Sequence, residues 1–289
     1  MNRDIVEASK RVKPLSPSLI NLLRATAKPE HSLGEILEII QLDSVLTAGI
    51  LRAANSAAFR KSREVESLNV AVSLLGERFV VGIAMELCSD GFFDQPLAGY
   101  ESEAGDLWRH SIKTAIAARL ISRHARRPLD SNLAFTAGIL HDIGKVVLSS
   151  FLEGSARQLA LSVGEGRDSL SYLDAEHKRL GSDHCEAGLA LAEHWRLPEC
   201  YRAAIGWHHQ PDKAPEAYVP FVFAVHMGDA LAMMSGAATG SDGMLYPLHP
   251  GYVQHFDLSA EATQLVFLDL EREFAAMSAS DGATGKEET

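Results

Sequence analysis

The sequence has few cysteines and none of the spacings that a cysteine framework requires. Its three cysteines, Cys88, Cys185 and Cys200, lie far apart in a chain of 289 residues and form no CxxC pair. Disulfide scaffolds and thiolate zinc fingers depend on close, regular cysteine spacing, so neither class is expected. The composition fits a reducing compartment.

Positive charge is also scarce. Lysine and arginine number 27 against 38 aspartates and glutamates, which gives a formal net charge of -11. Binding nucleic acid without regard to sequence needs a broad basic surface that replaces the counterions of the phosphate backbone. We therefore expect no broad nucleic-acid binding. The net charge does not exclude a local basic pocket.

Long apolar runs are missing as well. The N-terminal segment MNRDIVEASKRVKPL mixes charges throughout, and no later stretch is expected to approach the roughly 20 apolar residues of a membrane span. We expect a cytoplasmic protein with no membrane partner.

Strand patterns are nearly absent, whereas apolar residues at helical spacing recur along almost the whole chain. An all-α fold is predicted. Glycine and proline interrupt the pattern at 89–105 and at 235–259, the second of which resembles a long surface excursion. We therefore expect an N-terminal helical subdomain at 1–95 packed on a helical bundle at 96–235. Residues 236–289 are expected to form a loop, a C-terminal helix and a flexible tail.

Individual helices can be placed from caps and spacing. Ser32 and Glu35 form a predicted capping box, and Asp43 is predicted to cap the next helix. The expected helices cover roughly 33–40, 43–55, 67–75, 77–88, 107–125, 131–149, 169–180, 184–195, 198–208, 217–235 and 260–278.

Potential metal ligands are concentrated between positions 110 and 229. Imidazole and carboxylate groups are ligands for iron, manganese, zinc or nickel, and inward-facing helices often bring them together. Neighbouring residues on a helix point about 100° apart, so His141 could bind one ion while Asp142 bridges toward a second. The candidates are His110, His141, Asp142, His184, the pair His208 and His209, and Asp229.

The run GILHDIGK, from Gly138 to Lys145, resembles the core signature of the HD superfamily of metal-dependent phosphohydrolases. The wider match resembles the HDOD (HD-related output domain) branch and covers about 14–235. The further segments that carry it are Leu15-Ser16-Pro17, Asp43 to Thr47 and on to Ala57, Ala71 to Gly76, Trp108 to Ser111, Gly181 to His184, Trp195 to Pro198 and His208 to Pro211.

This resemblance implies a two-part helical architecture and a regulatory output module of bacterial signalling with a signalling protein as partner. Every position at which HD phosphodiesterases place a metal ligand is filled here by one of the candidates above. One or two divalent ions are thus implied. Lys145 matches a lysine that lies near the scissile phosphate in the cyclic-dinucleotide phosphodiesterase branch.

A metal-dependent phosphohydrolase acting on a nucleotide or cyclic dinucleotide is the alternative function. In that reading Asp142 and Lys145 are catalytic, and two ions about 3.5–4 Å apart would activate water and clamp the phosphoryl oxygens. The sequence QPDKAPEAY after His209 lacks the arginine and GYP signature of HD-GYP phosphodiesterases, however. A structural scaffold that retains an ancestral polar cluster is a third alternative.

Other polar residues have plainer interpretations. His226 lies three residues before Asp229, but an exposed or merely hydrogen-bonded role is expected for it. The basic cluster Arg119, Arg123, Arg126 and Arg127 follows a helical spacing and could meet an acidic partner or phosphate, but a solvated helix face is expected.

Overall fold

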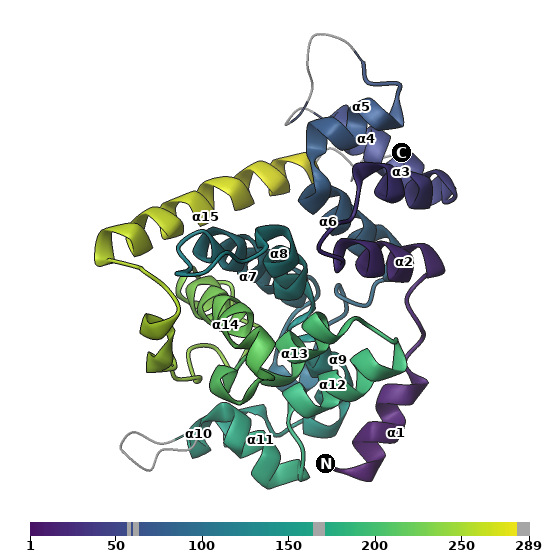
Figure 1. Cartoon of the computed structure of the whole chain (residues 1–289). Helices are drawn as coiled ribbons and strands as arrows, with labels where there is room; N and C mark the ends of the chain where they lie inside the picture. Colours follow the sequence, from purple (N-terminus) through teal and green to yellow (C-terminus); the bar gives the residue numbers. More distant parts are fainter. Residues whose placement is uncertain (57–58, 60–63, 164–170, 282–289) are drawn as a thin grey trace.

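The fold is all-helical, as the apolar spacing predicted (Figure 1). The computed structural model describes residues 1–56, 59, 64–163 and 171–281. Within these ranges the only β-type pairings are two isolated bridges, Leu97 to Ser102 and Ala125 to Phe256. The helices of the N-terminal part are α1 (Arg3–Arg11), α2 (Pro17–Thr26), α3 (Leu33–Gln41), α4 (Ser44–Ala54), α5 (Leu68–Leu75) and α6 (Glu77–Cys88).

The remaining helices run from residue 98 to the last described residue. Four of them are short 3-10 segments, η1 to η4. The elements are η1 (Ala98–Tyr100), α7 (Asp106–Ser122), α8 (Ser131–Leu140), α9 (Ile143–Leu152), α10 (Ala156–Ser162), α11 (Tyr172–Leu180), α12 (His184–His194), α13 (Glu199–Trp207), η2 (Pro211–Lys213), η3 (Glu216–Tyr218), α14 (Val219–Met234), η4 (Pro250–Gln254) and α15 (Ala260–Asp281).

The N-terminal caps follow the sequence closely, with one correction. Asp43 accepts hydrogen bonds from the backbone N–H groups of Val45 and Leu46 at the start of α4. Ser32 accepts from the N–H of Glu35, but the Glu35 carboxylate pairs with Lys28 instead of closing the predicted capping box. A salt bridge to a lysine on the preceding loop competes with the box for the same carboxylate.

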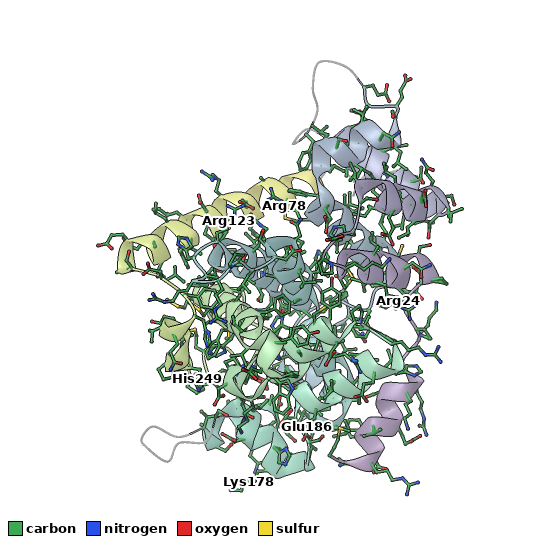
Figure 2. All side chains as sticks on the ribbon, in the orientation of Figure 1. Arg24, Arg78, Arg123, Lys178, Glu186 and His249 are labelled. Atoms are coloured by element: carbon green, nitrogen blue, oxygen red, sulfur yellow. The ribbon has the colours of Figure 1, made fainter. Side chains whose placement is uncertain are left out.

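Helix α7 forms the centre of the C-terminal part, with α8 and α14 packed along it (Figure 1). Nearly all its residues are buried, from Leu107 to Ser122, so it has no solvent-facing stripe. A helix that is buried on all sides belongs to the interior of a bundle. Charged side chains such as Arg24, Arg123 and Lys178 lie instead at the periphery of the molecule (Figure 2).

The predicted helix over 131–149 is wrong in one respect, because the chain breaks at His141 and Asp142. Helix α8 ends at Leu140 and α9 begins at Ile143, and Asp142 has φ -100° and ψ 13°. The doublet therefore lies at a junction between two helices. This places its side chains differently from neighbouring residues of one continuous helix.

Helices α9 and α12 cross in close contact next to this junction. A Cβ on Gly144 would lie 1.8 Å from the carbonyl oxygen of His184 and 2.5 Å from the backbone nitrogen of Gly188. Glycine is thus required for the two backbones to approach at this distance. The crossing holds Asp142 next to the start of α12.

Two segments are more apolar than the sequence analysis expected. Ser131–Leu152 and Glu216–Met234 reach mean hydropathies of 1.2 and 1.4, which by length and composition alone would suffice for a membrane span. In the folded chain 83% and 67% of these windows are buried inside the protein. Packing around α7 accounts for their apolar character.

The first helix lies away from the other N-terminal helices. In Figure 1, α1 runs beside α12, where the Asn2 side chain donates to the carbonyl oxygen of Leu180 (2.8 Å) and Ser9 Oγ donates to that of Ala187 (3.3 Å). The start of the chain thus packs on the C-terminal part.

The C-terminal helix α15 is anchored on α7 by charge. Lys113 Nζ lies 2.7 Å from Glu271 Oε1, and the Arg119 guanidinium pairs with Glu273. Arg119 is only 1% exposed, so the expectation that it belongs to a solvated helix face is wrong. The reason is that α15 covers this face of α7.

We expect Glu273→Gln to destabilise the fold by about 1–3 kcal/mol, because it leaves the buried Arg119 without its anionic partner. Urea unfolding measures the change. Asp269→Asn on the same helix removes an exposed ion pair with Arg272 and should cost less than about 1 kcal/mol. Equal losses in the two variants would contradict a special role for Arg119.

Candidate metal centre

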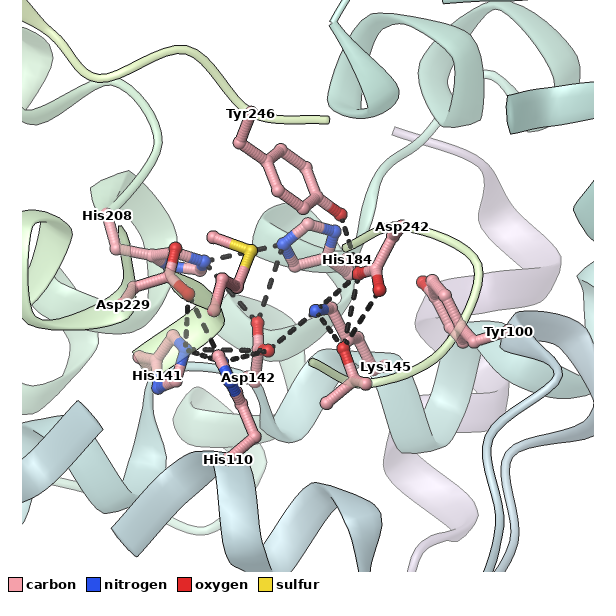
Figure 3. Close-up of polar contacts among 12 residues, drawn as sticks. Tyr100, His110, His141, Asp142, Lys145, His184, His208, Asp229, Asp242 and Tyr246 are labelled. Atoms are coloured by element: carbon pink, nitrogen blue, oxygen red, sulfur yellow. Dashed lines mark hydrogen bonds and ion pairs between the residues drawn. The ribbon is translucent and has the colours of Figure 1, made fainter. Parts of the chain in front are cut away.

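Six of the predicted ligands converge in one buried cluster, which we call the His–Asp centre (Figure 3). They come from α7, the α8–α9 junction, the start of α12, the end of α13, and α14. Each is at most 3% exposed. The centre consists of His110, His141, Asp142, His184, His208 and Asp229.

One end of the centre is built around Oδ2 of Asp142. Nε2 of His110 and Nε2 of His141 each lie 3.4 Å from this oxygen. Asp229 Oδ1 lies 3.1 Å from His110 Nε2 and 3.9 Å from His141 Nε2. Two imidazoles and two carboxylates thus face a common point.

The other end is built around the second oxygen of the same carboxylate. Asp142 Oδ1 lies 3.6 Å from His184 Nε2 and 3.5 Å from His208 Nε2. Asp142 therefore lies between two imidazole pairs, with one oxygen directed to each pair. This is the arrangement of a carboxylate that can bridge two cations.

The second nitrogen of each imidazole is already engaged. Because carbonyl oxygens only accept, Nδ1 must be the donor in His110 to Ala237 (2.7 Å), His141 to Gly138 (2.8 Å) and His208 to Ile205 (3.1 Å). Nδ1 of His184 lies 2.7 Å from Oε2 of Glu176. These bonds fix the rings with Nε2 directed inward, as the supporting partners of metal-binding histidines do.

The inward nitrogens fit a cation. Nε2 of His110 and His141 are 3.2 Å apart, and those of His184 and His208 are 3.4 Å apart. Two lone pairs at this distance repel unless a proton or metal ion lies between them. Two nitrogens bound at about 2.1 Å to one ion at a tetrahedral angle would lie about 3.4 Å apart, so both pairs match such an ion.

The charges of the centre favour the same interpretation. Burial lowers the pKa of His110, but the adjacent Asp142 and Asp229 outweigh it and raise that pKa to about 9. Burial lowers the pKa of His141. Burial also acts against ionisation of Asp142, yet the charges of His141 and Lys145 hold its pKa well below the usual value. Imidazoles beside an ionised carboxylate form a donor set that suits a divalent cation.

Asp142 also lacks conventional partners. Among the described residues neither of its oxygens accepts a hydrogen bond of ordinary geometry, although Lys145 Nζ lies 2.7 Å from Oδ2. Lys145 offsets the charge at Oδ2 only, and a buried Oδ1 with free lone pairs is costly unless a cation lies beside it as well.

The predicted lysine lies at the edge of the centre in a salt-bridge network. Besides Asp142, Lys145 Nζ contacts Asp242 Oδ2 at 2.6 Å and donates to Thr239 Oγ1 at 2.7 Å. Burial lowers the pKa of Lys145, but Asp142 and Asp242 outweigh it and raise it above the usual value. The ammonium group is thus charged and fully engaged by these neighbours (Figure 3).

His209 lies beside the centre but is placed differently from the other predicted ligands. Its Nδ1 is 3.8 Å from Asp229 Oδ2, and its ring stacks on Tyr246 with centroids 3.8 Å apart and an interplanar angle of 11°. Among the described residues neither ring nitrogen has a hydrogen-bond partner. It can join the centre only with a small displacement.

The two segments interrupted by glycine and proline, 89–105 and 235–259, both cover the centre. The expectation that 235–259 forms a surface excursion is therefore wrong for the first half of this segment. In residues 236–246, which we call the cover segment, Ala237, Thr239 and Asp242 are each at most 1% exposed. From the other segment, the Tyr100 hydroxyl donates to Glu176 at 2.7 Å. Glycine and proline allow the chain to turn inward here, which composition alone cannot distinguish from a surface loop.

Sequence reasoning missed the residues that support the ligands. Glu176 of α11 accepts from His184 Nδ1, from the His184 backbone N–H (3.0 Å) and from Tyr100. Asp242 and Tyr246 were missed as well, although Tyr246 donates to Asp242 at 3.0 Å. The only available signal was an acidic residue eight positions before His184, which is too common a pattern to single out.

We expect Glu176→Gln to weaken metal binding about 10–100-fold, the usual effect of removing the group that orients a metal-binding histidine. Competition with a chelator of known affinity measures the change. The exposed Glu193 on α12 provides the matched control, and Glu193→Gln should leave the affinity unchanged. Unchanged affinity in Glu176→Gln would mean that His184 needs no such support.

His226 has the hydrogen-bonded role predicted for it. It is 2% exposed, and its Nε2 accepts from the backbone N–H of His249 at 2.8 Å. Burial lowers its pKa to about 4, so it stays neutral. It holds the second half of the irregular segment against α14.

A family model connects this site with known proteins. The model that describes the HDOD domain matches residues 13–211 of the chain, and thus both helical parts. An uncharacterized protein of Treponema pallidum is 28% identical over 214 residues, which are 74% of this chain and 40% of that protein. The chain spans less than half the length of the curated relatives it matches.

Solved structures share the fold. A Marinobacter aquaeolei protein named as a signal transduction protein is similar with a TM-score of 0.75 and 23% identity, over 97% of this chain and 65% of that one. A Shewanella amazonensis protein named as a metal-dependent phosphohydrolase has a TM-score of 0.54 and 20% identity, over 93% and 92%. At these identities the likeness concerns the fold alone.

Proposed function

The chain belongs to the HDOD domain family, and on this premise we propose that it is a bacterial signal-transduction module whose His–Asp centre holds one or two divalent metal ions. One observation carries the proposal. Asp142 directs one oxygen to each of two imidazole pairs, and all four imidazoles have their other nitrogen engaged. A signalling protein partner and, as a ligand, a nucleotide or cyclic dinucleotide belong to the same proposal.

The residues would divide the metal ligands between two positions. His110, His141 and Asp229 would hold an ion with Asp142 Oδ2, and His184 and His208 would hold one with Asp142 Oδ1. His209, beside Asp229, would become a further ligand after a displacement of its ring. Nitrogen and carboxylate donors suit iron, manganese, zinc or nickel.

Burial of the centre supports the signalling role over catalysis. All six residues are nearly inaccessible, and the cover segment contributes Tyr246 directly above His209. A substrate would have to displace this segment, along with the Asp242 contact to Lys145. A metal ion enclosed in this way stabilises the helices that supply its ligands, and hence the surface that a partner would recognise.

A phosphohydrolase is the second candidate, favoured by the complete ligand set and by Lys145. A divalent ion supplies a Lewis acid that polarises a phosphoryl oxygen and lowers the pKa of water. Lys145, held next to Asp142, would neutralise charge on a phosphate once Asp242 released it. Asp142 would hold the two ends of the centre in a fixed position relative to each other.

Metal analysis combined with a hydrolysis panel tests both candidates. Protein purified without chelator should contain one to two transition-metal ions per chain, and the metal-loaded form should leave nucleotides and cyclic dinucleotides intact. If the wild type hydrolyses one of these compounds and Asp142→Ala abolishes this hydrolysis, the protein is a phosphohydrolase and the signalling proposal is wrong. If the protein contains less than one ion per chain and gains none on reconstitution, both candidate functions lose the metal centre on which they depend.

A further inference from the structure

A cavity opens where the N-terminal helices meet the C-terminal part of the chain. It has a volume of about 710 Å³ and is bordered by α4, α6, the start of α7 and the later part of α15, which runs toward α6 in Figure 1. Cavities that hold small organic ligands have volumes of about 300–1,000 Å³. The residues of the His–Asp centre do not border this cavity, so it is a separate site.

Most of the cavity wall is apolar. The rings of Phe59 and Phe79 meet edge to face, with centroids 4.9 Å apart. Trp108 of α7 and Phe274 and Met277 of α15 also border the cavity, and all five side chains are only partly buried. An apolar ligand would cover this surface and remove it from water.

Polar groups gather at one end of the cavity. The Asn55 side chain accepts from the backbone N–H of Val65 (2.7 Å) and donates to the carbonyl oxygen of the same residue (2.8 Å). These two hydrogen bonds tie the end of α4 to residues 64–66, and they bring Ser56 near Glu64 and Glu66. All three border the cavity, and both carboxylates are exposed and form no ion pair with a described residue.

Ser56 gives independent evidence for a ligand at this end. The residue is 9% exposed, and its hydroxyl group has no hydrogen-bond partner among the residues that the structure describes. A buried hydroxyl group without a partner is costly, and such groups are rare in folded proteins. Because Ser56 borders the cavity, a polar group of a bound ligand would satisfy it.

The charges around the cavity favour a cation. Two arginines border the cavity, but Arg109 is paired with Asp106 at 2.8 Å, which leaves Arg52 alone to offset the two free carboxylates. Glu86 adds a further carboxylate to the wall. Negative charge therefore prevails, and the faces of aromatic rings attract organic cations as well.

We propose that this cavity binds a small amphiphilic cation, namely an amine with an alkyl or aromatic body. The body lies among the aromatic side chains, and the ammonium group lies beside Glu64 and Glu66 and donates a hydrogen bond to the Ser56 hydroxyl. The inference goes beyond the proposed function and does not depend on it. Nucleotides and cyclic dinucleotides are anions and belong to the His–Asp centre.

Three probes with one tail and different head groups test the charge. Octylammonium, octanoate and octanol, each below its micelle concentration and solubility limit, would be titrated calorimetrically into the full-length protein. Octylammonium should bind with one molecule per chain. Octanoate should bind at least about 10-fold more weakly, because the carboxylates repel it, and octanol should lie between the two.

Two variants locate the binding site. A Cβ on Gly82 of α6 would meet only Met277 Cε, at 4.0 Å, so Gly82→Leu fills part of the cavity and should abolish octylammonium binding. Gly34→Leu makes the same change on the exposed surface of α3 and should bind like the wild type. Changing Glu64 and Glu66 together to glutamine should weaken octylammonium about 10-fold and leave octanol unchanged.

Octanoate that binds as tightly as octylammonium would overturn the cation site. Unchanged octylammonium binding in Gly82→Leu would show that the cavity is not the site, and failure of all three probes to bind would overturn the inference. Analytical ultracentrifugation tests another occupant. If the wild type forms a dimer that Gly82→Leu disrupts, a second copy of the chain fills the cavity and the inference is wrong. None of these results bears on the metal content of the His–Asp centre.

Discussion

Asp142→Ala should remove metal from the whole His–Asp centre, because this one carboxylate supplies an oxygen to each end. We expect the metal content of the purified variant to fall close to zero. The stabilisation by metal should be lost with it. In the wild type this amounts to about 4 kcal/mol at a free metal concentration 1,000 times the dissociation constant.

Elemental analysis and thermal unfolding with and without chelator measure the two effects. Asp212→Ala is the matched control, because Asp212 is exposed and, within the described chain, forms an ion pair only with His249. It should bind metal like the wild type. If Asp142→Ala keeps one ion per chain, the two ends work independently, and Asp142 is not a bridge.

Gly144→Ala should destabilise the fold by about 3 kcal/mol or more, at or above the upper end of the usual cost of overpacking. The added methyl group would overlap the carbonyl oxygen of His184, and backbone atoms cannot turn aside as a flexible side chain can. Helices α9 and α12 would have to separate. Because Asp142 precedes one helix and His184 begins the other, metal affinity should fall as well.

Gly206→Ala provides the control for this prediction. Gly206 lies in α13, and its new Cβ would meet only Leu189 side-chain atoms at 3.5 Å or more. Alanine favours the helix over glycine by up to about 1 kcal/mol, so this variant should be neutral or more stable. Urea unfolding compares the two variants. Equal stability of Gly144→Ala and the wild type would contradict the tight crossing.

The residues of the His–Asp centre could be singled out from sequence because each lies in a short, characteristic context. GILHDIGK, with His141 and Asp142, singles out the doublet, and the helical class follows from apolar spacing. The break between α8 and α9 could not be predicted, because apolar residues continue at helical spacing on both sides of it. It depends on the packing of α9 against α12, which is a property of the folded chain.

The supporting residues were harder to predict for a different reason. Glu176 and Asp242 act through partners brought near by the fold, namely His184 and Lys145. Arg119 was placed on a solvated face because a helix sequence does not reveal that α15 will cover it. In each case the missing information was a contact between segments distant in the sequence.

The distribution of the candidate ligands over the chain also has a kinetic consequence. His110 on α7 and Asp229 on α14 are in contact although more than a third of the sequence separates them, and the remaining ligands come from segments between them. Contacts of such large sequence separation form slowly, since the intervening chain must first lose its freedom. We therefore expect the geometry of the His–Asp centre to be completed late in folding. A bound ion should slow unfolding of the native protein while leaving its rate of folding almost unchanged.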